Sequence, residues 1–306
     1  MKIAYLILAH NTPRHLSRLV AALSSESSGF FIHLDRKSNE EDFRNIEGPG
    51  VHLAEERVAV YWGDFSQVEA TLLILRAALA DPRDFDRFVL LSGSDYPLRS
   101  ASFIEQFFAR NADKEFINLV TMPSQEAGKP LSRLTTYRVR PGEPTVGRIV
   151  RKALMKLRIQ ASRRDYTLYL RDLVPYGGST WWGLSREACE HVVSFVDRES
   201  QVVAFFKNTV CPDESFFQTI LGNSRFKSRI ARNLTYTDWS EGSSSPAVIT
   251  DKHLEFFRGH PSFPPDSVYG EGEMLFARKF PDGSESLVAS LREQIEEQGA
   301  PAVNKG

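Results

Sequence analysis

The sequence predicts an α/β domain with a mainly parallel central sheet and helices on both faces of that sheet. Apolar runs of strand length alternate with helical patterns through residues 1–120, as they do in βαβ units. The chain has 306 residues, of which 42% are hydrophobic, and this is enough for one large core. It contains neither an internal repeat nor a long linker. These observations favour a single α/β domain.

Strands are predicted where short apolar runs end in polar or turn-forming residues. The first run begins almost at the N-terminus and has the composition of a buried strand. The predicted strands are Ile3–Ala9, Phe30–Asp35, Val58–Tyr61, Arg87–Ser92, Glu115–Val120 and Ser179–Leu184.

Helices are predicted between these runs from capping residues and apolar spacing. Thr12 is the expected N-cap of a helix that opens with Pro13. Ser66 and Glu69 have the spacing of a capping box, ahead of a helix that runs through Ala80. Further helices are expected at Ser102–Arg110, after a cap at Ser185, and from about Pro212 to Leu221.

The domain prediction is one unit over residues 1–298, followed by a frayed tail at 299–306. Within it, residues 1–125 are expected to form a nucleotide-binding half. Residues 126–172 are interpreted as a basic loop and helix insertion. Residues 173–298 are expected to form the acceptor and catalytic half.

Composition excludes several classes of protein. No apolar run approaches the roughly 18 residues of a membrane-spanning helix, and the N-terminus does not have the pattern of a secretory signal. The two cysteines cannot form a disulfide framework or a four-ligand zinc site. We therefore expect a cytoplasmic protein. Nucleic-acid binding is disfavoured because the chain outside one basic segment is acidic and contains no recognised binding module.

That basic segment covers residues 129–171, where 12 Lys and Arg accompany only two acidic residues. Its centre, Arg148–Arg164, has the apolar stripe of an amphipathic helix. Such a helix can lie on the inner membrane face as a peripheral contact, which would suit a lipid-linked acceptor. It can instead bind an acidic polysaccharide, or pack on the core with a solvated basic face. The sequence leaves these three interpretations open.

Polar clusters follow four of the predicted strands. They are His10-Asn11, Asp35–Lys37, Trp62–Asp64 and Ser94–Tyr96. Ligands of open parallel sheets bind at the carboxyl ends of the strands, so these clusters are candidates for one crevice, although each also suits an ordinary turn. Neither Asp35 nor Asp95 belongs to an Asp-x-Asp pair that would hold a divalent metal, no Gly-x-Gly-x-x-Gly follows the first strand, and there is no Walker lysine.

A series of short motifs occurs in order between Tyr5 and Phe280: YLILAH, IHLDRKS, YWGDFSQVEATL, LLSGSDYPL, GGSTWWGLSRE, CPDESFFQTIL, YTDWSEG and LFARKF. Each motif is weak alone, but the ordered series resembles the core-2/I-branching glycosyltransferases. This family (glycosyltransferase family 14) contains β-1,6-N-acetylglucosaminyltransferases and peptide O-xylosyltransferases. The resemblance implies a GT-A-type, Rossmann-like fold and an inverting transfer from a UDP-sugar that needs no metal or other cofactor. It thus explains why neither Asp35 nor Asp95 belongs to an Asp-x-Asp pair.

The resemblance also assigns roles at the reacting atoms. The glutamate of the family's Pro-Asp-Glu motif is the base, and it corresponds to Glu214. From the residues alone, an ordinary glutamate in a first helical turn is the favoured interpretation of Glu214. The lysine of the Lys-Phe motif, which neutralises the departing diphosphate, corresponds to Lys279. No arginine follows Asp238-Trp239 as the family pattern requires, so the second cation is expected from Arg278, Arg232 or the basic segment.

The remaining candidate residues are predicted to bind the donor or the sugars. Trp181 and Trp182 are candidates for sugar stacking. Because side chains alternate along a strand, only one of the two can face the cleft, and Trp181 is favoured. The donor-site candidates are His10, Asp35 and Lys37 near the uridine, Asp95 at the sugar or ribose, and Arg278 with Lys279 at the diphosphate.

The function predicted from the sequence is that of a bacterial inverting glycosyltransferase. It would form a β-linkage to a saccharide acceptor in polysaccharide biosynthesis, with N-acetylglucosamine as the favoured donor sugar. Transfer of xylose is one alternative, and a non-catalytic protein that binds sugar nucleotides or glycans is another. A metal-dependent transferase that uses Asp95 as a ligand is a third.

Overall fold

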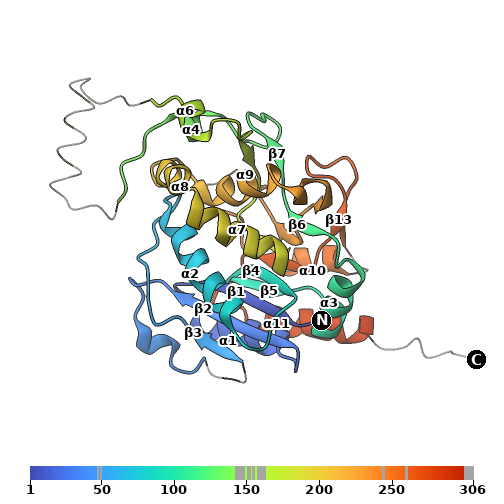
Figure 1. Cartoon of the computed structure of the whole chain (residues 1–306). Coiled ribbons are helices and arrows are strands. Elements are labelled where there is room, and N and C mark those ends of the chain that lie inside the picture. Colours follow the sequence, from blue (N-terminus) through green and yellow to red (C-terminus); the bar gives the residue numbers. More distant parts are fainter. Residues whose placement is uncertain are drawn as a thin grey trace, which may run out of the picture.

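A computed structural model of the chain describes residues 1–46, 48, 50–141, 149, 153, 156, 163–242, 245–258 and 261–299 (Figure 1). The predicted helix at Arg148–Arg164 lies almost wholly outside these residues. The tail from residue 300 onward also lies outside them. Among the described residues, no helix is both long enough and apolar enough to span a membrane.

The centre of the fold is a seven-stranded sheet in the order β10-β6-β9-β4-β1-β2-β3. Neighbouring strands are parallel except at β9, which runs antiparallel to both β4 and β6. The predicted mainly parallel sheet is therefore confirmed. The strands are β1 (Ile3–Ala9), β2 (Ser28–Leu34), β3 (Val51–Leu53), β4 (Arg87–Ser92), β6 (Glu115–Ile117), β9 (Trp182–Ser185) and β10 (Ile230–Ala231).

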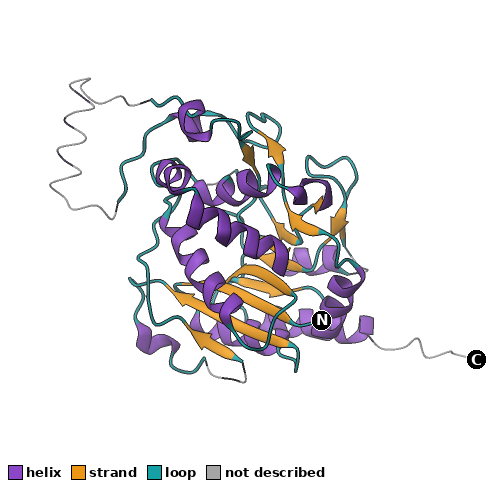
Figure 2. Ribbon diagram, viewed as in Figure 1, coloured by secondary structure: helices purple, strands orange, loops and turns teal. Residues whose placement is uncertain are grey.

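Helices cover both faces of this sheet, as Figure 2 shows. Successive residues of β1 point to opposite faces: Ala4 and Leu6 enter one buried cluster, and Tyr5 and Ile7 enter another. The first cluster contains the apolar sides of α2 (Ser66–Ala80), α7 (Arg186–Arg198), α8 (Ser200–Phe206) and α9 (Phe216–Gly222). The second contains those of α1 (Pro13–Leu23) and α3 (Ala101–Arg110).

The C-terminal part adds a smaller layer beside the main sheet. Strands β11 (Thr235–Thr237), β14 (Phe276–Arg278) and β5 (Asp95–Pro97) form a three-stranded sheet in that order. A third apolar cluster joins this sheet to α10 (Asp251–Phe257) and α11 (Glu285–Gly299). The other elements are short: β7 (Val120–Thr121), β8 (Tyr176–Gly177), β12 (Ser262–Phe263), β13 (Gly272–Glu273), α4 (Ser132–Thr135), α6 (Thr167–Leu170), η1 (Glu40–Phe43), η2 (Pro212–Glu214) and η3 (Arg225–Arg229).

The predicted strand at Val58–Tyr61 is wrong, because the edge strand of the sheet is β3 instead. Two N–H groups of this segment donate to side chains rather than to a neighbouring strand. The Val58 N–H donates to His33 Nε2 at 2.8 Å, and the Val60 N–H donates to Asp35 Oδ1 at 3.4 Å.

The capping box predicted at Ser66 is also wrong. Ser66 is the first residue of α2, and its N–H donates to Asp64 Oδ1 at 2.9 Å. Its hydroxyl accepts from the Tyr61 N–H instead of capping the helix. Glu69 does not reach back to the N-terminus of the helix, because its carboxylate pairs with Arg140.

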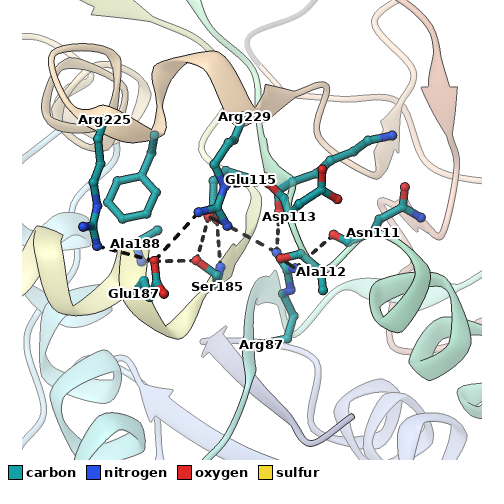
Figure 3. A network of polar contacts seen from close by, with 12 residues as sticks. Arg87, Asn111, Ala112, Asp113, Glu115, Ser185, Glu187, Ala188, Arg225 and Arg229 are labelled. Carbon is teal, nitrogen blue, oxygen red and sulfur yellow. Dashed lines mark hydrogen bonds and ion pairs between the residues drawn. The ribbon is translucent and has the colours of Figure 1, made fainter.

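A buried ion network joins strands of the main sheet to η3 and to the end of α3 (Figure 3). Glu115 on β6 is fully buried and accepts from the Ser185 N–H and hydroxyl, at 2.8 and 2.6 Å. Arg87 on β4, 1% exposed, lies 3.9 Å from the same carboxylate, and Arg229 lies 3.4 Å from it. Arg87 also donates to carbonyl groups at the end of α3 and in the turn that follows it. The network thus ties β4, β6, β9 and η3 together at the amino ends of β4 and β6.

Candidate active site

The loops after β1 and β2 form one end of the candidate site. Asp35 follows β2, and its carboxylate accepts from the Lys37 N–H at 2.9 Å and from Lys37 Nζ at 2.7 Å. Burial acts to raise the pKa of Asp35, but the contacts with Lys37 and the Val60 N–H outweigh it and lower this pKa. Lys37 Nζ also lies 4.6 Å from the centroid of the Tyr61 ring. This loop therefore presents an ionised carboxylate and an ammonium group side by side.

Asp95 and Arg278 form the middle of the site. They are paired residues of β5 and β14, and Arg278 Nε lies 3.5 Å from Asp95 Oδ1. Asp95 is fully buried, and its other oxygen accepts from the Ser92 N–H. Burial raises the pKa of Asp95 to about 6, although Arg278 acts in the opposite direction. The Arg278 guanidinium carbon lies 4.3 Å from the centroid of the Trp181 ring, so Arg278 is held between a carboxylate and an aromatic face.

His10 and Lys279 lie close to these charges. Burial lowers the pKa of His10, while Asp35 acts to raise it and Lys279, Arg278 and Lys37 act to lower it further. The charges of these four residues therefore all act on His10. We call these five residues, together with Asp95, the donor end of the site.

Glu214 lies at the other end, in the turn η2. One of its oxygens, Oε2, accepts from both Lys129 Nζ and Arg133 Nη1. Burial acts to raise the pKa of Glu214, but the two cations outweigh it, and the pKa is lowered. The neighbouring Asp213 behaves in the opposite way: burial, followed by the charge of Glu214, raises its pKa to about 6. Glu214 is therefore the stronger acid of the two carboxyl groups in this turn.

A short segment, 178–181, connects the two ends of the site. The Gly178 N–H donates to Glu214 O at 2.9 Å, and the Thr180 hydroxyl donates to Asp213 Oδ2 at 2.7 Å. The next residue, Trp181, contacts Arg278. Glycine is required at position 178, because a Cβ there would lie 1.9 Å from the Asn118 carbonyl oxygen. This segment thus contacts both the turn η2 and Arg278 of the donor end.

The two tryptophans, Trp181 and Trp182, pack against different partners. Trp182 begins β9, is 2% exposed and packs against Phe217 with ring centroids 5.6 Å apart. Trp181 is 8% exposed and lies against Arg278. Of the pair, only Trp181 has the placement that the stacking prediction requires. That either residue stacks on a sugar stays a prediction.

Arg232, one of the candidate second cations, lies elsewhere. Its guanidinium carbon is 3.5 Å from the centroid of the Phe263 ring, and it donates to the Gly270 carbonyl at 3.0 Å. Arg278 is therefore the better placed of the two arginines beside Lys279. The central part of the basic segment lies outside the described residues.

The sequence does not single out three residues that lie near Glu214. Lys129 and Arg133 were recognised only as members of a basic segment, although their charge was the available signal. Tyr269 lies near enough for the charge of Glu214 to help burial raise its pKa to about 12. Its loop carries no motif that would have singled it out.

Charged groups gathered at the carboxyl ends of a mainly parallel sheet are the arrangement in which α/β domains commonly bind their ligands. The chain belongs to the Core-2/I-Branching enzyme family, whose family model matches residues 3–258. It is 30% identical over 253 residues to xylosyltransferase 2 of Rattus norvegicus, covering 78% of this chain and 27% of that protein. It is 24% identical over 296 residues to a xylosyltransferase of Ciona intestinalis, covering 92% of this chain and 32% of that protein.

The chain thus spans about a third or less of the length of these curated relatives. Among solved structures, the apo form of mouse xyloside xylosyltransferase 1 matches 90% of this chain and 97% of its own. That match has 11% identity and a TM-score of 0.35.

Proposed function

We propose that this protein is an inverting glycosyltransferase that moves a sugar from a UDP-sugar to a hydroxyl of a glycan acceptor, without a metal ion. Family membership supports the transferase class. The names of the curated relatives support xylose as the first donor sugar to test. N-acetylglucosamine, the donor sugar that the sequence favours, is the second donor sugar to test. The lipid-linked or acidic acceptor and the contact of residues 148–164 with a membrane stay predictions.

The observation that carries the proposal is the asymmetric environment of Glu214. Both cations contact Oε2, and among the described residues Oε1 accepts no hydrogen bond. The side chain is 25% exposed, and Oε1 is the oxygen proposed to accept from an incoming hydroxyl. Lys129 and Arg133 fix the orientation of the carboxylate and keep it ionised, so that it can accept a proton, and their lowering of its pKa makes it a weaker base.

The reaction follows as one in-line displacement. The acceptor oxygen attacks the anomeric carbon and forms the new C–O bond while its proton passes to Glu214 Oε1. The bond from the anomeric carbon to the phosphate oxygen breaks, and UDP leaves with the electron pair. The configuration at the anomeric carbon is therefore inverted.

Arg278 and Lys279 are the groups proposed to neutralise the departing diphosphate. Fixed cations stabilise the negative charge that develops on a leaving group. The placement of Asp95 supports this assignment over a metal site, because one of its oxygens faces the Arg278 guanidinium and the other accepts a backbone N–H. An arginine so close to the carboxylate disfavours a divalent cation at the same place.

UDP-sugars are expected to protect the protein against thermal unfolding in the presence of EDTA. A ligand that binds only the folded state raises the free energy of unfolding, by about 2.7 kcal/mol at a hundred times its Kd. A panel of UDP-xylose, UDP-N-acetylglucosamine, UDP-glucose and UDP-galactose, read by differential scanning fluorimetry, identifies the donor without knowledge of the acceptor.

The matched control is Lys279→Met, which should weaken protection by UDP. Lys227→Met on η3, a change of the same kind outside the proposed site, should leave it unchanged. Protection that appears only after Mn²⁺ or Mg²⁺ is added would contradict the metal-free proposal. A protein that binds UDP-sugars without turnover would instead be the non-catalytic alternative.

A further inference from the structure

The segment Val60–Gly63 contacts the donor end at its start and, at its end, the residue before the turn η2, which carries Glu214. At its start, Val60 bonds to both members of the Asp35–Lys37 pair: its N–H donates to Asp35 and its carbonyl accepts from Lys37. At its end, the Gly63 carbonyl accepts from the Cys211 N–H at 3.0 Å. Cys211 directly precedes the turn that carries Glu214. The backbone in the middle of this segment therefore lies between the Asp35–Lys37 pair and the turn that carries Glu214.

Trp62 occupies that position, and it is 71% exposed. It is the most exposed of the four tryptophans of the chain: Trp181 and Trp182 are buried, and Trp239 is 54% exposed. A single exposed apolar side chain on a protein surface is ordinary. The functional interpretation depends on where the Trp62 indole lies and on how firmly its backbone is held.

The backbone on both sides of Trp62 is fixed. Arg138 Nη2 donates to the Trp62 carbonyl at 2.6 Å, and the Asp64 N–H donates to the Tyr61 carbonyl at 3.1 Å. Gly63 has a φ of +62°, which glycine adopts without strain, and a Cβ there would lie 3.1 Å from Cys211 Sγ. The chain thus immobilises the peptide while leaving the indole exposed, and such preorganisation favours ligand binding.

We propose that the Trp62 indole is the stacking surface for a sugar ring of the acceptor. The inference rests on the proposed function and extends it to a binding residue. A pyranose ring has a face made of C–H groups, which packs on the flat apolar face of an indole. The acceptor is favoured over the uracil of UDP because Gly63 bonds to the loop of Glu214, the carboxylate that must contact the acceptor hydroxyl.

The test is binding of the full chain to a printed glycan array in the presence of UDP, followed by titration of the glycans that bind. Trp62→Ala should weaken binding of those glycans at least about tenfold, while Trp62→Phe should retain most of it. Phe256→Ala, which removes a 49% exposed aromatic side chain from α10, is the matched control and should bind like the wild type. UDP should protect all four proteins equally against thermal unfolding.

Equal glycan binding by the wild type and Trp62→Ala, or no glycan binding by the wild type, would overturn the inference while leaving donor binding intact. Loss of UDP protection in Trp62→Ala would also overturn it, because Trp62 would then belong to the nucleotide. Failure of UDP to protect even the wild type would instead refute the proposed function, and the inference with it.

Discussion

Glu214→Gln is expected to lower the rate of sugar transfer at least about a hundredfold, a usual scale for the loss of a general base. The amide has nearly the same shape as the carboxylate but cannot take the acceptor proton. Binding of UDP should be nearly unchanged, because the Glu214 side chain is hydrogen-bonded to Lys129 and Arg133 rather than to the donor end. The measurement is release of UDP from the donor at saturating acceptor, paired with thermal protection by UDP.

Glu190→Gln is the matched control, since Glu190 lies on α7 in an exposed pair with Arg186. It should transfer sugar at the wild-type rate. A Glu214→Gln protein that retained wild-type turnover would remove Glu214 from the mechanism. One that lost protection by UDP as well would place this residue in donor binding or in the stability of the site.

The second large effect is expected on stability. Glu115→Ala should lower the free energy of unfolding by about 3–5 kcal/mol, because it leaves the buried Arg87 guanidinium without its anionic partner. Arg87 keeps its carbonyl acceptors, but these do not compensate a full charge in a site of low polarity. Urea unfolding followed by circular dichroism measures the change.

Glu187→Ala provides the comparison within the same network. Glu187 is 62% exposed and pairs with Arg225 and Arg229 at the surface, so its loss should cost no more than about 1 kcal/mol. A loss for Glu115→Ala as small as that for Glu187→Ala would show that Arg87 needs no anionic partner.

Local signals, namely apolar runs and capping residues, predicted several elements correctly. The runs at Ile3–Ala9 and Arg87–Ser92 became β1 and β4, and Ser185 caps α7 by accepting from the Ala188 N–H. The strand predicted at Val58–Tyr61 is wrong because N–H groups of this segment donate to side chains on β2 and in the loop after it. Such long-range contacts outweigh the preference of a short apolar run for a strand.

The candidate site shows the same limit. The polar residues at strand ends could be predicted to meet, because parallel strands bring their carboxyl ends to one edge. The pairing of Glu214 with Lys129 and Arg133 could not, since 85 and 81 residues separate these partners. One amino-acid sequence has no local pattern that predicts contacts between such distant residues. The division into halves at residues 1–125 and 173–298 also stays a prediction, although strands of both halves alternate in the main sheet.

The central claim, an inverting transfer that needs no metal, is tested most directly by the first sugar anomer released. UDP-xylose, or the donor that the thermal panel selects, is incubated with the wild-type protein and EDTA, without an acceptor, so that water takes the acceptor's place. Proton NMR then follows the anomeric signals before mutarotation mixes them. We expect the β-anomer to appear first from the α-linked donor, with Glu214→Gln releasing far less sugar. Initial release of the α-anomer, or release only after Mn²⁺ or Mg²⁺ is added, would contradict the account.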